Sequence, residues 1–238
     1  MARDLFAFVS GATHGIGKAI ALELARNGVN HVAINARTVT DLEDTARELR
    51  AVQDDIDCLI VPADLSKRKS AFDAAEMVLN WCPRLDILVN NTGLYLHGKV
   101  LSEDEGNLET MMATNVYSAY HVTRKLIPHL QHGRKSHVFN ICSVASLYVY
   151  SGGSYTITKY AMRGFNASLR EELKSSNVRV TAVYPGPVMS RAWGDYKPTQ
   201  NELLDAADVA KSIWSAWQLS DNACVEEILI RPQIGDFV

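Results

Sequence analysis

Short apolar runs and longer amphipathic stretches alternate along the whole chain. The apolar runs lie at residues 5–10, 31–35, 58–61, 85–89, 137–141, 178–183 and 227–230, and each has the length of a buried strand. Apolar positions recur at helical spacing near residues 16–27, 39–52, 71–81, 102–130, 155–173 and 208–217, which predicts six helices. Ser102 and Glu105 have the spacing of a capping box at the start of the fourth helix, and Pro128 predicts a kink or a stop near its end.

The order of these elements predicts the fold class. Strands and helices alternate with short connections, and no repeat or low-complexity linker divides the chain. We therefore predict a single α/β domain over residues 1–238: a Rossmann fold with a doubly wound parallel sheet of about seven strands and helices on both faces. Ligands of such sheets bind beyond the carboxyl ends of the strands. Residues that fall at such ends, and should converge on one crevice, are Gly11, Asn90, Ser143 and Pro185.

Composition narrows the class of protein. The chain has 238 residues, 47% of them hydrophobic and 21% charged, and its net charge of -3 offers no basic footprint for nucleic acid or an anionic membrane. The chain has no run of ~20 apolar residues and no apolar signal segment, so we expect no membrane partner and a cytoplasmic location. The cysteines are scattered, and His129 and His132 have no apparent third ligand, so we predict reduced thiols and no metal site.

A glycine-rich turn joins the first strand to the first helix. Its sequence is Ser10-Gly11-Ala12-Thr13-His14-Gly15-Ile16-Gly17, and the absence of Cβ atoms lets a pyrophosphate approach the helix N-terminus. The second strand ends at Arg37 without a carboxylate, and a guanidinium suits a 2′-phosphate, so the pattern favours NADP(H) over NAD(H). His14 could add to that pocket or be a surface turn residue. Asp64, followed by Leu65, could hold the adenine amino group or cap a helix.

Tyr155 and Lys159 are four residues apart in a predicted helix, so their side chains should share one face. A free phenol loses its proton near pH ~10, too high for proton transfer at neutral pH. An ammonium about 4 Å away contributes ~1 kcal/mol in bulk water but ~4 kcal/mol at an effective dielectric constant near 20. Lys159 could therefore activate Tyr155 only in a cleft that excludes most water.

Taken together, these residues resemble the pattern of the short-chain dehydrogenase/reductase family over nearly the whole chain. The family marks occur in order: Gly11, Gly15 and Gly17; Asp64; Asn90-Asn91-Thr92-Gly93; Asn115; Ser143; Tyr155 and Lys159; and Pro185-Gly186-Pro187-Val188. The residues Ser10, Thr92 and Ser190 depart from the commonest family choices, but each keeps the size or the hydroxyl group.

The resemblance implies an NADPH-dependent oxidoreductase that reduces a carbonyl to an alcohol. It implies that Tyr155 donates a proton to the carbonyl oxygen, Ser143 hydrogen-bonds that oxygen, and Lys159 makes the tyrosine more acidic and holds the nicotinamide ribose. Asn115 would anchor a water that relays protons to Lys159. The glycine turn, Arg37 and the resemblance together give the expected cofactor contacts: Gly11, Thr13, His14, Gly15, Ile16, Gly17, Arg37, Asp64, Leu65, Asn91, Thr92, Gly93, Tyr155, Lys159, Pro185, Gly186, Val188 and Ser190. Members of the family usually form homo-dimers or homo-tetramers through the helices that contain Asn115 and Tyr155.

The substrate is less determined than the cofactor. Expected contacts are Tyr95, Ala145, Tyr150 and Trp193, with a loop at about residues 189–205 closing over them. Such aromatics suggest a flat or apolar carbonyl compound, although any one of them could instead pack at a subunit interface. The tail around Val225–Ile228 and the segment around Trp193 resemble bacterial sepiapterin-reductase-like members, in which this tryptophan could stack on a pterin. Similar tails occur in 3-oxoacyl thioester reductases, so the substrate stays open.

A hydrolase nucleophile at Ser143 would need a Gly-x-Ser-x-Gly elbow, and residues 141–145 do not supply one. A regulatory protein that senses NADP(H) without turnover is the non-enzyme alternative, and the intact set of Asn115, Ser143, Tyr155 and Lys159 favours the enzyme.

Overall fold

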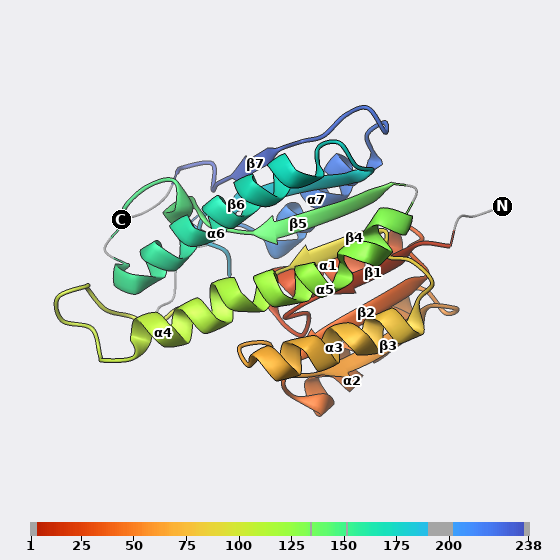
Figure 1. The fold of residues 1–238 in the computed structure, drawn as a ribbon, viewed down its shortest axis with the longest axis horizontal. Helices are drawn as coiled ribbons and strands as arrows, with labels where there is room; N and C mark the ends of the chain where they lie inside the picture. Colours follow the sequence, from red (N-terminus) through yellow and green to blue (C-terminus); the bar gives the residue numbers. More distant parts are fainter. Residues whose placement is uncertain (1–3, 134, 151, 190–201, 236–238) are drawn as a thin grey trace.

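The computed structural model describes residues 4–133, 135–150, 152–189 and 202–235 (Figure 1). Seven strands form one parallel sheet in the order β3-β2-β1-β4-β5-β6-β7. The strands are β1 (Phe6–Val9), β2 (His31–Ala36), β3 (Asp57–Pro62), β4 (Ile87–Asn90), β5 (Ser136–Ile141), β6 (Val178–Pro185) and β7 (Glu227–Ile230). This topology confirms the predicted doubly wound α/β fold.

Helices cover both faces of the sheet. The helices α1 (Gly15–Arg26), α2 (Val39–Val52) and α7 (Ala206–Gln218) pack on one face, whereas α3 (Arg68–Trp81), α5 (Ser118–His132) and α6 (Gly153–Leu173) pack on the other and lie in front of the sheet in Figure 1. Alternate residues of one strand therefore enter different cores: Ala7 and Val9 face the first, and Phe6 and Phe8 face the second. Burial on both faces explains why the strands are continuous apolar runs.

The fourth predicted helix differs from the expectation. Instead of one helix over residues 102–130, the chain forms α4 (Asn107–Met112), a π-helical turn η1 (Ala113–Tyr117) and α5. The predicted capping box is wrong, because α4 begins after Gly106, whose φ is 87°, and no side chain caps it. Pro128 does not stop the helix, since α5 continues to His132. Because η1 joins α4 to α5 without a break, residues 107–132 still follow one continuous helical path.

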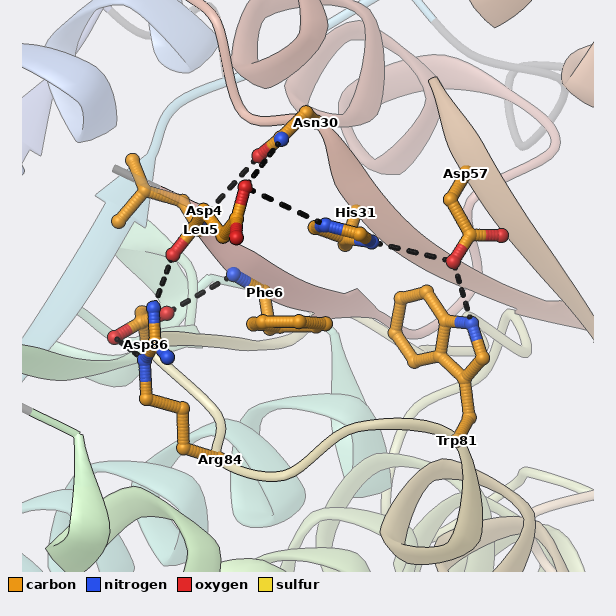
Figure 2. A network of polar contacts seen from close by, with 9 residues as sticks. All are labelled: Asp4, Leu5, Phe6, Asn30, His31, Asp57, Trp81, Arg84 and Asp86. Atoms are coloured by element: carbon orange, nitrogen blue, oxygen red, sulfur yellow. Dashed lines mark hydrogen bonds and ion pairs between the residues drawn. The ribbon is translucent and has the colours of Figure 1, made fainter. Parts of the chain in front are cut away.

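The amino-terminal ends of the strands are joined by a polar network (Figure 2). Asp86, just before β4, accepts a hydrogen bond from the Phe6 amide at 3.0 Å, and the His31 ring stacks on Phe6 with centroids 4.2 Å apart. Asp57 accepts from Trp81 Nε1 at 2.9 Å and lies 3.2 Å from His31 Nδ1. Burial raises the pKa of Asp86 although its hydrogen bonds act in the opposite direction. These contacts hold the strands together at their amino-terminal ends, on the side of the sheet opposite the carboxyl ends.

None of the described helices is both long enough and apolar enough to cross a bilayer.

Candidate active site

A cleft of about 1190 Å³ opens at the carboxyl ends of the strands. It is lined by parts of the segments 11–16, 35–41, 63–66, 91–95, 110–114, 142–145, 150–156 and 185–188. Segments that are far apart in the sequence thus meet at one edge of the sheet, as expected for parallel strands. Most of the predicted cofactor residues line this cleft, and so do Tyr95, Ala145 and Tyr150. Ser190 and Trp193 lie outside the described residues, as does most of the predicted covering loop.

The glycine turn after β1 requires glycine for two different reasons. Gly11 and Gly15 have φ angles of 61° and 51°, in the left-handed region that favours glycine. A Cβ at Gly15 would have no atom within 4 Å, so this position opens to the cleft. A Cβ at Gly17 would instead lie 2.2 Å from the Gly11 carbonyl oxygen, because α1 packs directly against the turn. Gly17 therefore shapes the site without lining it.

The N-terminus of α1 faces this turn. His14 is the N-cap residue, but its side chain does not cap the helix, and the first turn contains no acidic residue. The His14 ring nitrogen Nδ1 lies 3.0 Å from Thr13 Oγ1. First-turn amides and the positive end of the helix dipole are a suitable site for an anionic group such as a pyrophosphate.

Hydrogen bonds from the segment after β4 hold the turn in place. Ser10 Oγ accepts from the amides of Asn91 and Thr92 at 2.9 and 3.0 Å. The Asn91 side chain donates to the carbonyl oxygens of Ser10 and Gly11 at 3.0 and 2.9 Å. Its amide group is therefore engaged by the turn itself. Thr92 Oγ1 is buried without a hydrogen-bond partner among the described residues, and its residue lines the cleft.

The end of the cleft beside β2 and β3 carries charges of both signs. Arg37 is exposed there, and Asp41 and Asp64 line the same end. Asp64 Oδ1 accepts from the hydroxyl and the amide of Ser66 at 2.6 and 3.1 Å. The Ser66 hydroxyl, helped by the nearby charges of Lys67 and Arg37, lowers the pKa of the Asp64 carboxyl. The helix-capping alternative for Asp64 is wrong, because Lys67 is the N-cap residue of α3.

Tyr155 and Lys159 lie on adjoining turns of α6, and Ser143 lies two residues after the end of β5. Lys159 is 6% exposed; its Nζ donates to the Ile141 carbonyl at 3.2 Å and lies 5.6 Å from the centroid of the Tyr155 ring. Ser143 Oγ accepts from the Ala145 amide at 3.1 Å. Ser143 and Tyr155 both line the cleft, whereas Lys159 is buried behind it.

The Asn115 side chain joins three segments of the site. Its Oδ1 accepts from the Leu94 amide at 2.6 Å, and its Nδ2 donates to the Leu94 carbonyl at 2.9 Å and to Thr158 Oγ1 at 3.0 Å. Thr158 Oγ1 in turn donates to the Tyr155 carbonyl at 2.8 Å. Asn115 is 2% exposed and lies in the π-helical turn η1. It therefore acts on the cleft through Leu94 and Tyr155.

Tyr95 forms an aromatic wall with Tyr155. The two ring centroids are 5.0 Å apart at an interplanar angle of 85°. Tyr95 Oη lies 3.2 Å from His97 Nδ1. Burial, and then the charge that Tyr155 can carry, raises the pKa of the Tyr95 phenol.

Four threonines of the cleft were not predicted from the sequence: Thr38, Thr110, Thr114 and Thr156. Thr110 and Thr114 are four residues apart and precede Asn115 in a predicted helix. A hydroxyl pair at helical spacing just before the family asparagine is the signal that would have found them. Thr156 follows Tyr155 directly, so its own spacing offered no separate signal.

Comparison with known proteins places these features among oxidoreductases. Residues 6–201 match the family model described as short chain dehydrogenase. The chain is 30% identical to the sepiapterin reductase of Chlorobaculum tepidum over 236 residues, which cover 96% of each chain. It superposes with a TM-score of 0.89 on an alcohol dehydrogenase from the archaeon Thermococcus sibiricus complexed with 5-hydroxy-NADP, at 26% identity and 97% coverage of both chains. A metagenomic short-chain oxidoreductase in complex with NADP has a TM-score of 0.83 and 29% identity, with 96% of this chain and 97% of that chain covered.

Replacing Gly17 by alanine tests the packing of α1 against the turn. The added Cβ would clash with the Gly11 carbonyl, so we expect Gly17→Ala to lower the free energy of unfolding by ~1–3 kcal/mol. Urea denaturation measures this. Gly164→Ala is the matched control, because no atom lies within 4 Å of its Cβ position in α6, and it should be neutral or stabilising. Equal stability of the two variants would contradict the packing role of Gly17.

Proposed function

This chain belongs to the short chain dehydrogenase family, and we propose that it reduces a carbonyl compound to an alcohol, reversibly, with NADPH as the hydride donor. One observation carries the proposal: Ser143 and Tyr155 line the same cleft as the glycine turn after β1, and Lys159 lies behind Tyr155. A dinucleotide at the turn would then extend toward a proton donor.

The residues of the cleft fit a bound dinucleotide. Gly15 leaves open space beside the N-terminus of α1, where the pyrophosphate would bind. Gly93, Pro185, Gly186 and Val188 also line the cleft, and the nicotinamide would bind beside them. The bound nucleotide supplies the hydride; all other steps belong to side chains of this chain.

Tyr155 donates the proton to the carbonyl oxygen of the substrate. Ser143 Oγ uses a lone pair to accept from Ala145, which leaves its own hydrogen to donate to the same oxygen. An ammonium has three N–H donors, and Ile141 takes one of those of Lys159. The others would hold the nicotinamide ribose of a bound cofactor, and the buried positive charge would stabilise the tyrosinate left after proton transfer. Asn115 holds the surrounding segments and anchors a water that relays protons to Lys159.

We favour NADP(H) over NAD(H) as the cofactor. β2 ends without a carboxylate at the position where an NAD-binding site would carry one, and Arg37 follows it at the cleft. The solved relatives named above contain NADP or a modified NADP. Asp41 and Asp64 line the same end of the cleft, and their negative charges would repel a 2′-phosphate. The preference for NADP(H) therefore depends on the Arg37 guanidinium reaching that phosphate.

The substrate we propose is a carbonyl compound with a flat or apolar body. Tyr95, Ala145 and Tyr150 line the cleft near Tyr155 and offer aromatic and methyl surface. The similarity to a sepiapterin reductase favours a pteridine-type substrate as the specific candidate. A 3-oxoacyl thioester is the alternative, and a regulatory protein that binds NADP(H) without turnover is the alternative outside enzymes.

Turnover and its dependence on Tyr155 test the reaction. We expect loss of NADPH absorbance with at least one member of a panel of diketones, sepiapterin and acetoacetyl thioesters. Tyr155→Phe should lower kcat by about 10²- to 10⁴-fold, the usual contribution of a general acid, and leave NADPH binding intact. Normal turnover by this variant would overturn the mechanism. Binding of NADPH by a wild type that reduces nothing in the panel would favour the sensor.

Cofactor preference tests the role of Arg37. We expect a higher kcat/KM with NADPH than with NADH, and Arg37→Ser should reduce the NADPH value by about 10- to 100-fold, the equivalent of one charge-assisted hydrogen bond. The NADH value should change little, because NADH has no 2′-phosphate. If the wild type uses NADH as well as NADPH, the argument from Arg37 fails.

Self-association is part of the proposal. Exposed apolar side chains lie on neighbouring helices, with Tyr117 and Tyr120 at η1 and α5 and Ile157 and Tyr160 on α6. The Tyr120 and Phe165 rings are 6.0 Å apart, so these helices present one surface. Sedimentation velocity should detect dimers or tetramers, and Ile157→Glu should shift them toward monomer by placing a charge on this surface. A monomeric wild type would exclude this interface.

A further inference from the structure

The loop between β4 and α4 is attached at two points to the elements that carry Asn115 and Tyr155. Near its start, Leu94 is held by Asn115 through both backbone groups. Near its end, Glu103 reaches the first turn of α6. Glu103 Oε2 accepts from the Ser154 amide at 3.2 Å, and Oε1 accepts from the Ser154 hydroxyl. Ser154 is 1% exposed and directly precedes Tyr155.

Backbone packing reinforces this contact. A tight turn presents Glu103, since the amides of Ser102 and Glu103 both donate to the Lys99 carbonyl at 2.8 Å. A Cβ at Gly98 would lie 2.4 Å from Glu103 Cβ. A Cβ at Gly153 would lie 2.6 Å from the Gly98 carbonyl oxygen and 3.0 Å from Glu103 Oε2. A side chain at Gly153 would therefore push the loop away from the helix, and a side chain at Gly98 would displace Glu103 within the loop.

Glu103 does not line the cleft, so it acts through the residues it holds. Its carboxylate satisfies an amide at the N-terminus of α6, where negative charge is also favoured by the helix dipole. The first turn of that helix carries Tyr155, and the loop carries Tyr95, whose ring contacts Tyr155 edge-on at 5.0 Å. The contact between Glu103 and Ser154, which we call the latch, thus joins the two segments that carry Tyr95 and Tyr155.

We infer that Glu103 is a positioning residue for the reaction: by latching the loop to the first turn of α6, it fixes Tyr155 and Tyr95 relative to each other. The kinetic consequence rests on the proposed function, whereas the latch itself does not. Misplacement of a reacting group by about 1 Å can cost on the order of 100-fold in rate, so the contact need not touch the substrate to matter.

Four variants separate positioning from general stability. Glu103→Ala removes the latch, and Glu103→Gln keeps it without charge, because an amide can accept from the Ser154 amide and donate to its hydroxyl. Gly98→Ala adds a Cβ that would clash with Glu103 and displace it from Ser154. Glu105→Ala is the matched control, because Glu105 is exposed on the same loop, carries the same charge and makes no side-chain hydrogen bond or ion pair within the described part of the chain.

Each variant is measured for kcat and KM with NADPH, for NADPH affinity by fluorescence titration, and for hydrogen–deuterium exchange of residues 94–102 and 153–157. We expect Glu103→Ala to lower kcat by on the order of 10- to 100-fold while NADPH affinity stays unchanged. Gly98→Ala should act in the same direction, Glu103→Gln should restore most of kcat, and Glu105→Ala should match the wild type. Exchange should rise in both segments in Glu103→Ala and nowhere else.

Unchanged exchange in Glu103→Ala would overturn the latch. Increased exchange with a wild-type kcat would overturn its role in positioning, as would a Glu103→Gln variant as slow as Glu103→Ala. If the wild type reduces no carbonyl compound while exchange rises in both segments, the proposed function fails and the latch stands.

Discussion

The geometry of the cleft depends on the buried amide of Asn115. A side chain that is 2% exposed must satisfy its polar atoms internally, and Asn115 does so with Leu94 and Thr158. These partners belong to the loop after β4 and to α6, and the Thr158 hydroxyl in turn donates a hydrogen bond to the Tyr155 carbonyl. Loss of the amide would leave several buried groups unpaired at once, at a cost of roughly 1–3 kcal/mol for each. The π-helical turn that carries Asn115 is the kind of local irregularity that often marks a functional site.

The two edges of the sheet serve different purposes. The amino-terminal edge is closed by charged and aromatic side chains that pair with one another, as in the contacts of Asp57 and Asp86 (Figure 2). The carboxyl ends of the strands are open and lined by glycines and hydroxyl groups, with Lys159 buried behind them. The cleft therefore keeps groups such as Gly15 and Ser143 accessible.

Much of the fold was predictable because its signals are local. Strand and helix periodicity located the sheet, and the glycine turn after β1 fixed the position of the cleft. The start of α4 was predicted wrongly because Ser102 and Glu105 match a capping box. In the structure the Ser102 and Glu103 amides instead donate to the Lys99 carbonyl and form a turn. The π-helical turn has no distinct sequence pattern, and Pro128 sits inside a helix whose packing outweighs its local preference. Local propensity is a weak predictor wherever tertiary contacts decide.

The site was predictable to the extent that its residues follow strands. Ser143 and Tyr155 line one cleft as expected, but the contact of Glu103 with Ser154 spans 51 residues and leaves no pattern in either segment. The same holds for Asn91, whose side-chain amide donates to two carbonyl oxygens of the glycine turn. Long-range polar contacts of this kind depend on the packed structure, so a sequence pattern cannot reveal them.

A crystal structure with NADP⁺ and an alcohol product bound tests the central claim most directly. The account predicts the pyrophosphate at the N-terminus of α1, and the product oxygen within about 2.6–3.2 Å of both Tyr155 Oη and Ser143 Oγ, beside the nicotinamide ring. A nicotinamide directed away from Tyr155, or a product oxygen that neither hydroxyl reaches, would contradict it.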